Sequence, residues 1–289
     1  MRILLFGKNG QLGWELERRL PALGELTVLD YPQIDFNQPD SLPEIVRNSR
    51  PDVIINAVAY TNVDKAEIEP QIARRVNADA VGEIASSARE LGALLVHIST
   101  DYVFDGCKGS PYVESDLPNP LGIYAATKLA GEEAILQAGC AHLTLRTAWL
   151  YSLRGDNFLL KVLKWARAYP VLRLASDQIG NPTAAHLLAE MIFQTLQLPL
   201  KDLTEHSGIY HLAGEGAASR YELGLEILRN DPHPQEQVVQ SILPALAADF
   251  PAQAERPLNT SMDCNLFCQV FGFGLPHWTE GVRQTLLGA

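Results

Sequence analysis

The sequence lacks clusters of basic residues. Its 34 Asp and Glu outnumber its 23 Lys and Arg, which gives a formal net charge of −11. Duplex binding depends on grouped Lys and Arg that displace counterions, so this composition argues against a protein that tracks nucleic-acid phosphates. An anionic small ligand remains compatible, because backbone N–H groups and a few cations can bind phosphate locally.

The sequence also has few cysteines and no long apolar run. Its four cysteines, Cys107, Cys140, Cys264 and Cys268, show no paired metal-ligand spacing, which favours reduced thiols. The apolar run at residues 1–6 is too short for a signal-peptide core or a membrane span. We therefore expect a cytoplasmic protein with neither a membrane nor a nucleic acid as its partner.

What is present is the composition of a globular enzyme, with 47% hydrophobic and 20% charged residues and no internal repeat. In the first half, short apolar runs alternate with stretches whose apolar residues recur at helical spacing. The expected strands are residues 3–6, 26–29, 53–55, 94–98 and 143–145. The expected helices are residues 11–20, 40–48, 72–91 and 123–137. This alternation predicts an α/β fold with a Rossmann-type doubly wound parallel sheet.

The alternation weakens after Trp149. The elements expected there are helices at 157–168, 184–196 and 221–228, and short strands near Val171 and Tyr210. Proline-rich stretches at 231–234 and 250–257 interrupt the pattern. At 289 residues the chain exceeds the usual length of one domain. We expect a dinucleotide-binding Rossmann domain at residues 1–150 and a smaller, mainly substrate-binding lobe at 151–289, whose chain can interleave with the first domain.

A glycine-rich loop follows the first expected strand and opens the first expected helix. Its spacing is G-x-x-G-x-x-G, with Gly7, Gly10 and Gly13 at the glycine positions. Gly7 allows a tight turn, Gly10 lets the backbone approach a pyrophosphate, and Gly13 permits close helix packing. The helix N-terminus attracts phosphate. A plain glycine turn is the alternative, but the strand and helix on either side favour a dinucleotide site.

The choice between NADH and NADPH stays open at this stage. Asp30 ends the second expected strand, where a carboxylate can accept hydrogen bonds from the adenosine ribose and favours NADH. Lys8 in the glycine loop could instead neutralise the 2′-phosphate of NADPH. The cofactor trough is expected to continue along two further segments that leave the second and third strands: Asp35, Phe36, Ala59, Tyr60 and Thr61.

A tyrosine and a lysine lie four residues apart on one expected helix. Tyr124 and Lys128 can therefore reach the same pocket, where the lysine ammonium would lower the tyrosine pKa and make the phenol a usable proton donor. Thr100, chosen over Ser99, ends the fourth strand and could bind the substrate oxygen, while Asp101 could contact sugar hydroxyls. A Y-x-x-x-K pair alone is more typical of a solvated helix face, and the strand-end hydroxyls favour catalysis.

Taken together, these segments resemble the extended short-chain dehydrogenase/reductase superfamily, and within it the dTDP-4-dehydrorhamnose reductase family. The resemblance runs nearly the full chain and includes residues 6–13, 64–67, 99–104, 146–151, 177–183 and 256–257. It implies reduction of the C4 keto group of dTDP-4-dehydro-L-rhamnose to dTDP-L-rhamnose by hydride transfer from NADPH or NADH. It also implies a role in supplying activated rhamnose for surface polysaccharides.

The resemblance also implies roles for particular residues. Those expected to contact the cofactor are Gly10, Gln11, Leu12, Asp30, Asp35, Phe36, Ala59, Tyr60, Thr61, Tyr124 and Lys128. Those expected to contact a dTDP-linked 4-keto sugar are Thr100, Asp101 and Trp149, with Arg256 a candidate partner of the pyrophosphate. Some relatives are associated with Mg²⁺ at a dimer contact, which makes Glu15 and Glu190 candidate ligands. The chain end lacks a late acidic residue, so we do not assign a metal, while a homodimer stays possible.

Three alternatives stay open beside this interpretation. The first is another reductase of nucleotide-linked sugars. The second is an epimerase or 4,6-dehydratase of the same superfamily, although dehydratases carry an acidic pair after the strand-end Thr, whereas Thr100 precedes Asp101 and Tyr102. The third is a noncatalytic nucleotide-binding subunit, such as the relatives that regulate methionine adenosyltransferase. The intact set of Thr100, Tyr124 and Lys128 argues against this third alternative.

Overall fold

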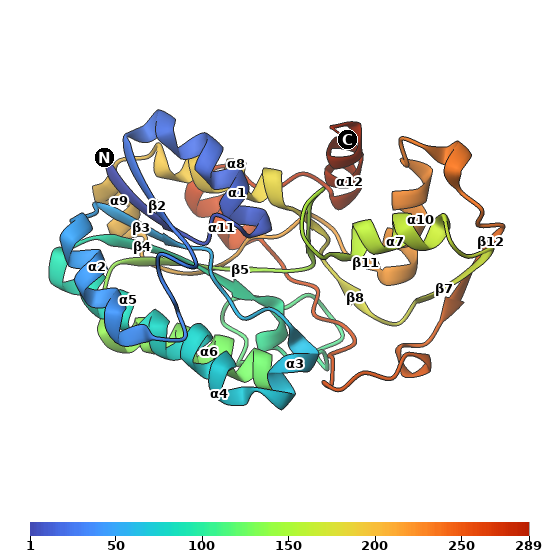
Figure 1. The fold of residues 1–289 in the computed structure, drawn as a ribbon, viewed down its shortest axis with the longest axis horizontal. Coiled ribbons are helices and arrows are strands. Elements are labelled where there is room, and N and C mark those ends of the chain that lie inside the picture. The colour runs from blue at the N-terminus through green and yellow to red at the C-terminus, as the bar shows by residue number, and fades with distance from the viewer. Residues whose placement is uncertain (289) are drawn as a thin grey trace.

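The computed structural model describes residues 1–288, which form a six-stranded parallel sheet covered by helices and a smaller second lobe (Figure 1). The strand order is β10-β5-β4-β3-β1-β2, and every neighbouring pair is parallel. The bounds are β1 Arg2–Phe6, β2 Glu25–Leu29, β3 Val53–Asn56, β4 Leu94–Thr100, β5 His142–Thr147 and β10 Gly208–His211. The predicted doubly wound α/β fold is confirmed.

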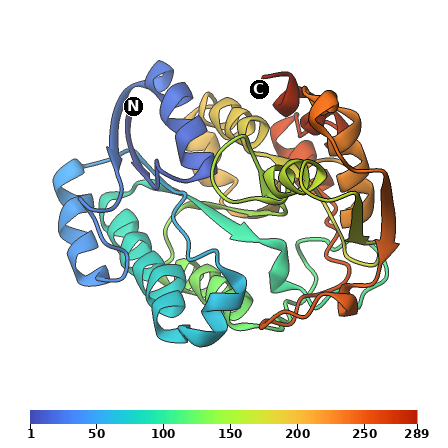
Figure 2. The same ribbon diagram turned by 45° about the vertical axis from the view of Figure 1, so that its right-hand side comes forward.

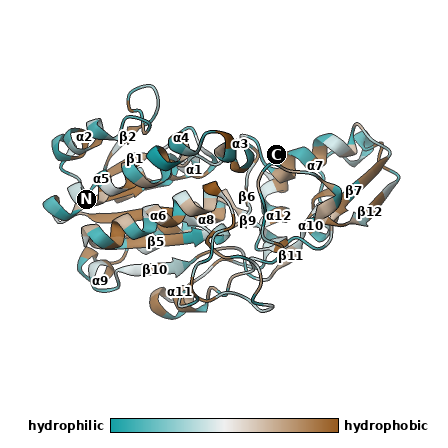
Figure 3. Ribbon diagram, turned by 90° about the horizontal axis from the view of Figure 1, so that it is seen from below, coloured by the Kyte–Doolittle hydropathy of each residue, from teal (hydrophilic) through white to brown (hydrophobic). Residues whose placement is uncertain are grey.

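Helices cover both faces of this sheet. One face packs against α1 (Gln11–Arg19), α8 (Ala185–Leu196), α9 (Leu200–Glu205) and α11 (Asn265–Phe271). The other face packs against α2 (Leu42–Ser49), α5 (Ala80–Leu91) and α6 (Ile123–Ala138). Because helices cover both faces, the central strands β3 and β5 are buried along their whole length, and Figure 3 shows the sheet between its helices.

The single helix expected at residues 72–91 is instead divided into three parts. After α3 (Val63–Ile68), the chain forms α4 (Pro70–Arg74), a π-helical segment (Arg75–Asp79) and then α5. The side chain of Asn77 accepts a hydrogen bond from the Tyr60 N–H and donates one to the Tyr60 carbonyl. A π-helical turn is a common way to place such a residue at a functional site. The helical spacing of apolar residues did not reveal it.

The second lobe is built entirely from residues after Trp149. It contains three two-stranded ladders, β6 with β9, β8 with β11 and β7 with β12, around three helices. Their bounds are β6 Leu150–Tyr151, α7 Phe158–Ala166, β7 Val171–Ala175, β8 Ile179–Gly180, β9 Thr183–Ala184, β11 Ala218–Ser219, α10 Arg220–Arg229, β12 Ser241–Ala245 and α12 Trp278–Leu287. This lobe has an apolar core of its own (Figure 2).

The second half of the chain crosses between the lobes several times. From β9 it returns to the large sheet as α8, α9 and β10, passes back through α10 and β12, and reaches the sheet again at α11. The edge strand β10 is therefore supplied by residues that are more than 60 positions from its partner β5. Within the part of the chain that the structure describes, no helix is long and apolar enough to cross a bilayer.

Candidate active site

The glycine loop joins β1 to α1 in a conformation that side chains would obstruct. Gly7 has a φ of +96°, and a Cβ there would lie 2.9 Å from the backbone carbon of Ala57. A Cβ at Gly13 would lie 1.9 Å from the carbonyl oxygen of Gly7. The loop thus packs tightly against itself and against the end of β3, which leaves the free N–H groups at the start of α1 to bind phosphate. This cradle fits a dinucleotide pyrophosphate.

Gln11 and Leu12 contribute to this cradle through their backbone. The Leu12 side chain is buried in the core. The Gln11 side-chain oxygen instead accepts hydrogen bonds from Ser152 Oγ at 2.8 Å and Asn157 Nδ2 at 2.9 Å. Both donors belong to the second lobe, so the first helix of the cofactor cradle is joined directly to the substrate side.

Asp30 holds the glycine loop in place. Its two carboxylate oxygens accept hydrogen bonds from the backbone N–H groups of Asn9, at 2.8 Å, and Tyr31, at 2.7 Å. The carboxylate therefore lies directly beside the glycine loop at the end of β2. This is where an adenosine ribose would lie in a fold of this type.

The two further segments of the predicted cofactor trough lie at the carboxyl edge of the sheet. Phe36 is buried edge-on against Phe6, with 5.5 Å between ring centroids, and Asp35 accepts hydrogen bonds from the next turn of the chain. The Tyr60 hydroxyl donates to Glu69 at 2.7 Å. Ala59 is half-buried and Thr61 exposed. The edge has small and flat groups here, which suits an adenine ring.

Asn77 is a residue of this site that the sequence patterns did not reveal. Besides fixing Tyr60, it donates a hydrogen bond to the hydroxyl of Thr127 at 3.1 Å, one turn after Tyr124 on α6. It is 1% exposed. Asn77 thereby ties the cofactor edge to the helix that carries the tyrosine and the lysine.

The tyrosine and the strand-end threonine meet where α6 begins. The Glu67 carboxylate accepts a hydrogen bond from the Ile123 N–H at 2.7 Å and so holds the first turn of α6 in place. Burial raises the pKa of Tyr124, while a hydrogen bond with Thr100 acts in the opposite direction. The strand-end hydroxyl of Thr100 thus lies beside the Tyr124 phenol. Its predicted contact with the substrate oxygen stays a prediction. A protonated phenol of this kind is suited to donate a proton.

One predicted interaction is wrong. Lys128 was expected to lower the pKa of Tyr124, but the pKa is raised and Lys128 is not among the groups that shift it. The Lys128 Nζ instead donates a hydrogen bond to the Ile98 carbonyl at 2.6 Å and lies 3.3 Å from His97 Nε2. Burial lowers the pKa of Lys128 to about 8. Burial of both groups outweighs their spacing of one helical turn.

Asp101 lies inside the wall of the site rather than on its surface. It is 2% exposed and accepts hydrogen bonds from the hydroxyls of Thr260, at 2.5 Å, and Thr100, at 3.1 Å. Burial raises its pKa to about 6. The expected contact between Asp101 and sugar hydroxyls is therefore not favoured by its position, which instead orients Thr100.

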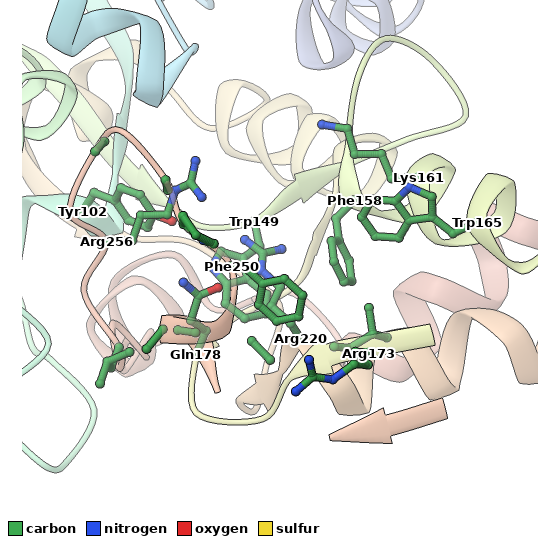
Figure 4. A pocket seen from close by; sticks show the side chains of 18 of the residues that line it. Tyr102, Trp149, Phe158, Lys161, Trp165, Arg173, Gln178, Arg220, Phe250 and Arg256 are labelled. Carbon is green, nitrogen blue, oxygen red and sulfur yellow. The ribbon is translucent and has the colours of Figure 1, made fainter. Parts of the chain in front are cut away.

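A cavity of about 790 Å³ opens between the lobes next to this group (Figure 4). Tyr102, which lies edge-on to Tyr124 with ring centroids 6.1 Å apart, forms one end of its lining. The cationic lining residues are Lys161, Arg173, Arg220 and Arg256, and the aromatic ones include Trp149, Phe158, Trp165 and Phe250. Cations and flat rings in one cavity suit a ligand that carries both phosphate and a nucleobase.

Trp149 and Arg220 form the centre of the cavity. The Arg220 guanidinium carbon lies 3.5 Å from the centroid of the Trp149 ring and 4.8 Å from that of Phe158. A Cβ on Gly180 would lie 2.7 Å from the Trp149 indole, so the absence of a side chain there makes room for the ring. Trp149 has a φ of +45°. Trp149 therefore lines this cavity, and its contact with substrate stays a prediction.

Arg256 also lies in the cavity wall, at the end of the segment that follows β12. Its guanidinium forms an ion pair with Asp64 at 2.6 Å, and the Ala254 N–H donates to the same carboxylate at 3.1 Å. Asp64 is on α3, beside the large sheet. The contact therefore ties the proline-rich segment of the second lobe to the first lobe and holds Arg256 beside Tyr102.

Most of the cavity lining was not identified from the sequence. The sequence predicts only a helix at residues 157–168, yet Phe158, Lys161 and Trp165 all face the cavity from α7. Arg173 comes from β7 and Arg220 from the start of α10. The sequence held one signal for these lining residues. In α7, a cation and two aromatic residues recur at spacings of three and four, within the half of the chain that is expected to bind substrate.

The candidate magnesium ligands are separated by a cation. Arg19 forms ion pairs with Glu15 at 2.7 Å and Glu190 at 3.3 Å. A guanidinium between two carboxylates already offsets one of their two negative charges. Among residues 1–288 there is no group of three or more His, Cys, Asp or Glu side chains arranged to hold a metal ion. The residues present therefore do not fit a metal site within one chain.

Comparison with known proteins agrees with this geometry. The family model described as the RmlD substrate binding domain matches residues 1–288. This chain belongs to that family. It is 41% identical to the dTDP-4-dehydrorhamnose reductase of Escherichia coli K12 over 293 aligned residues, covering 99% of this chain and 97% of that protein. The predicted membership of the dTDP-4-dehydrorhamnose reductase family is confirmed.

Solved structures of the RmlD family superimpose over the whole chain. A dTDP-4-dehydrorhamnose reductase from Clostridium acetobutylicum has a TM-score of 0.91 at 30% identity, with both chains covered completely. The Bacillus anthracis enzyme of the same name, solved in complex with NADP, has a TM-score of 0.90 at 32% identity and covers 100% of this chain and 99% of that one. The agreement includes both lobes.

Proposed function

We propose that this RmlD-family protein reduces the C4 keto group of dTDP-4-dehydro-L-rhamnose to give dTDP-L-rhamnose, with NADPH or NADH as the reductant. The observation that carries this proposal is that Tyr102, which lies edge-on to Tyr124, lines a cavity with four cations in a chain that also has a dinucleotide cradle. The full-length kinship with dTDP-4-dehydrorhamnose reductases supports the choice of sugar nucleotide.

The two ends of the cavity support different parts of this substrate. Arg256 lies beside Tyr102 and Arg220 lies at the centre of the cavity, and their charges suit the diphosphate. Phe158 and Trp165 lie further along the cavity from Tyr102, where flat rings suit the thymine base. The keto sugar would then extend toward Thr100 and Tyr124, with the diphosphate setting its distance from them.

The proposed reaction requires one hydride and one proton. NADPH or NADH supplies the hydride to the carbonyl carbon when bound. The Tyr124 hydroxyl gives its proton to the carbonyl oxygen, which becomes the C4 hydroxyl and is never left as an isolated alkoxide. The Thr100 hydroxyl donates to Asp101 in the structure, so it would turn from Asp101 to donate a hydrogen bond to the same substrate oxygen. The Tyr124 phenolate then regains a proton through Lys128, which lies one turn later on α6.

The division of labour between the lobes is part of the proposal. Residues 1–150 would bind mainly the dinucleotide, and the lobe after residue 150 would bind mainly the sugar nucleotide, with Ala289 outside the described residues.

We also place the protein in the cytoplasm, which is supported by its water-soluble substrate and its free cysteines. Light scattering would show whether it forms the homodimer that the family resemblance allows.

The test is the oxidation of reduced nicotinamide, followed by its near-ultraviolet absorbance. Purified protein would be incubated with dTDP-4-dehydro-L-rhamnose and with NADPH or NADH in separate reactions. Substrate-dependent oxidation supports the proposal and ranks the two cofactors. Cofactor binding without oxidation would contradict it and would favour a different sugar nucleotide or a noncatalytic subunit.

A further inference from the structure

A buried hydroxyl from late in the chain lies against the wall of the candidate active site. Thr260 is 1% exposed, and its hydroxyl donates a hydrogen bond to Asp101 Oδ2 at 2.5 Å. The other oxygen of this carboxylate, Oδ1, accepts a hydrogen bond from the Thr100 hydroxyl at 3.1 Å. Asp101 therefore lies between Thr100 and a residue that is 159 positions later in the chain.

The segment that carries Thr260 is hydrogen-bonded to both lobes. In the second lobe, the Thr260 N–H donates to the Ile179 carbonyl at 3.0 Å, and the Ile179 N–H donates to the Leu258 carbonyl at 2.6 Å. From the first lobe, the Tyr112 N–H donates to the Ser261 carbonyl at 2.8 Å. Because its backbone is held on two sides, Thr260 presents its hydroxyl at a fixed point.

The Asp101 carboxylate needs both hydroxyls to keep its orientation. A buried carboxylate is costly unless its oxygens accept hydrogen bonds or face a cation. Burial raises the pKa of Asp101, while the hydrogen bonds from Thr260 and Thr100 and then the charge of Arg220 lower it. Without the Thr260 hydroxyl, the carboxylate would turn toward Arg220 to replace the lost donor. That rotation would take Oδ1 away from Thr100.

We propose that Thr260 is a positioning residue of the candidate active site. Its hydroxyl holds the Asp101 carboxylate so that Oδ1 reaches Thr100 and keeps the Thr100 Oγ1 beside the Tyr124 phenol. The Thr100 hydrogen can still turn to a substrate oxygen without moving Oγ1, which also accepts a hydrogen bond from the Tyr102 N–H at 3.2 Å. The effect on catalysis rests on the proposed function, whereas the hold of Thr260 on Asp101 does not.

The same segment also forms part of the substrate cavity. Arg256 and Leu258, which come shortly before Thr260, line that cavity. A Cβ on Gly106 would lie 3.0 Å from the backbone nitrogens of Leu258 and Asn259, so the first lobe packs closely against the segment. The cavity wall and the contact with Asp101 therefore belong to one piece of chain that is fixed in place.

The first test follows the Asp101 carboxyl by NMR and needs no sugar substrate. The full chain with ¹³C-labelled aspartate would be titrated, and the Asp101 signal identified by its loss in Asp101→Asn. Losing a hydrogen bond to the charged form disfavours that form, so Thr260→Val should raise the Asp101 midpoint by about one pH unit. Thr260→Ser keeps the hydroxyl and should leave the midpoint unchanged. Tyr102 and Tyr124 do not interfere, because burial raises their pKa values.

The second test measures the reductase reaction. Thr260→Val should lower kcat roughly tenfold, which is the effect of about one misplaced hydrogen bond. KM for the sugar nucleotide and NADPH affinity should not change, because Thr260 is proposed to contact neither ligand. Thr260→Ser should restore most of kcat. Ser261→Ala is the matched control, since it removes a buried hydroxyl of the same segment that faces Asn259 and not Asp101.

The two tests fail in different ways. An unchanged Asp101 midpoint in Thr260→Val would overturn the proposal whether or not the protein is a reductase. A raised midpoint with an unchanged kcat, or equal losses of kcat in Thr260→Val and Thr260→Ser, would also overturn it. Absence of NADPH oxidation by the unmodified protein would contradict the proposed function instead. If Thr260→Val does not fold, Thr260→Cys, a weak donor of similar size, takes its place with the same expected directions.

Discussion

The cofactor side and the substrate side of this site are built by different means. The cofactor cradle is one continuous loop, residues 7–13, whose function depends on backbone groups and on positions without a side chain. The substrate cavity is assembled from side chains between residues 102 and 258, which come from α7, β7, α10 and the segment after β12. A short motif can therefore specify the first, whereas only the folded chain brings the second together.

The largest effect is expected where the two sides meet. Tyr124→Phe removes the only atom proposed to give a proton to the substrate while keeping the ring, so kcat should fall by roughly 100- to 10,000-fold. NADPH affinity, measured by calorimetry, should stay within a factor of about three. A variant with an unchanged kcat would show that another group donates the proton.

The next prediction concerns a substitution that should weaken cofactor binding and leave the substrate cavity unchanged. Gly13→Ala places a methyl group 1.9 Å from the Gly7 carbonyl oxygen, so the loop must shift. We expect NADPH affinity to fall by roughly 100-fold, since forced repacking costs about 1–3 kcal/mol or more. Gly82→Ala on α5 is the matched control, because its Cβ would lie 3.4 Å from the nearest side chain. Equal affinity in the two variants would contradict the tight-loop account.

The third prediction concerns the buried carboxyl between the two sides. Because the pKa of Asp101 is about 6 in the folded protein and near 4 when unfolded, the folded state holds the proton more tightly. The contribution of Asp101 to the free energy of unfolding should therefore fall as pH rises from about 4 to about 6, by up to about 3 kcal/mol. Asp101→Asn should remove this fall in urea unfolding.

Asp52 provides the control of opposite sign. Hydrogen bonds from the Arg2 backbone and side chain lower the pKa of the Asp52 carboxyl. Its contribution to stability is thus present above the unfolded pKa and is lost as pH falls through the folded one. Asp52→Asn should weaken stability at neutral pH and leave the Asp101 effect intact. The same pH slope in the unmodified protein and Asp101→Asn would disprove the assignment.

The fourth prediction concerns a substitution that should weaken binding of the sugar nucleotide and leave cofactor binding unchanged. Arg220→Met keeps an apolar stem beside Trp149 and Phe158 but removes the charge, so KM for the sugar nucleotide should rise roughly tenfold. NADPH affinity should not change. Arg229→Met, at the exposed end of the same helix, is the control. If both variants raise KM equally, Arg220 has no special role in the cavity.

The smallest effect is expected at the hydrogen bonds that join Gln11 of the cofactor cradle to the substrate lobe. Gln11→Ala removes the acceptor of Ser152 and Asn157, so the benefit that bound dTDP gives to NADP⁺ affinity should fall by a few-fold, about 1 kcal/mol. Calorimetry with and without dTDP measures it. Unchanged coupling would show that the two sides bind independently.

The same comparison explains what the sequence could predict. The parallel sheet and the glycine loop follow local spacing, and each was predicted within a residue or two of its place. Asn77 was missed because a π-helical turn leaves no clear periodic signal. The direction of the Tyr124 pKa shift was wrong because burial depends on the whole fold. The burial of Asp101 beside Thr260, 159 positions away, is likewise a property of tertiary structure.

The most direct test of the account follows the hydride itself. The protein would be incubated with dTDP-4-dehydro-L-rhamnose and NADPH that carries deuterium at the transferred position, and the product examined by NMR. The account predicts one deuterium at C4 of the sugar for each NADPH oxidised. A converted sugar without deuterium and without NADPH consumption would indicate an enzyme that keeps its cofactor, such as an epimerase, and would contradict the account.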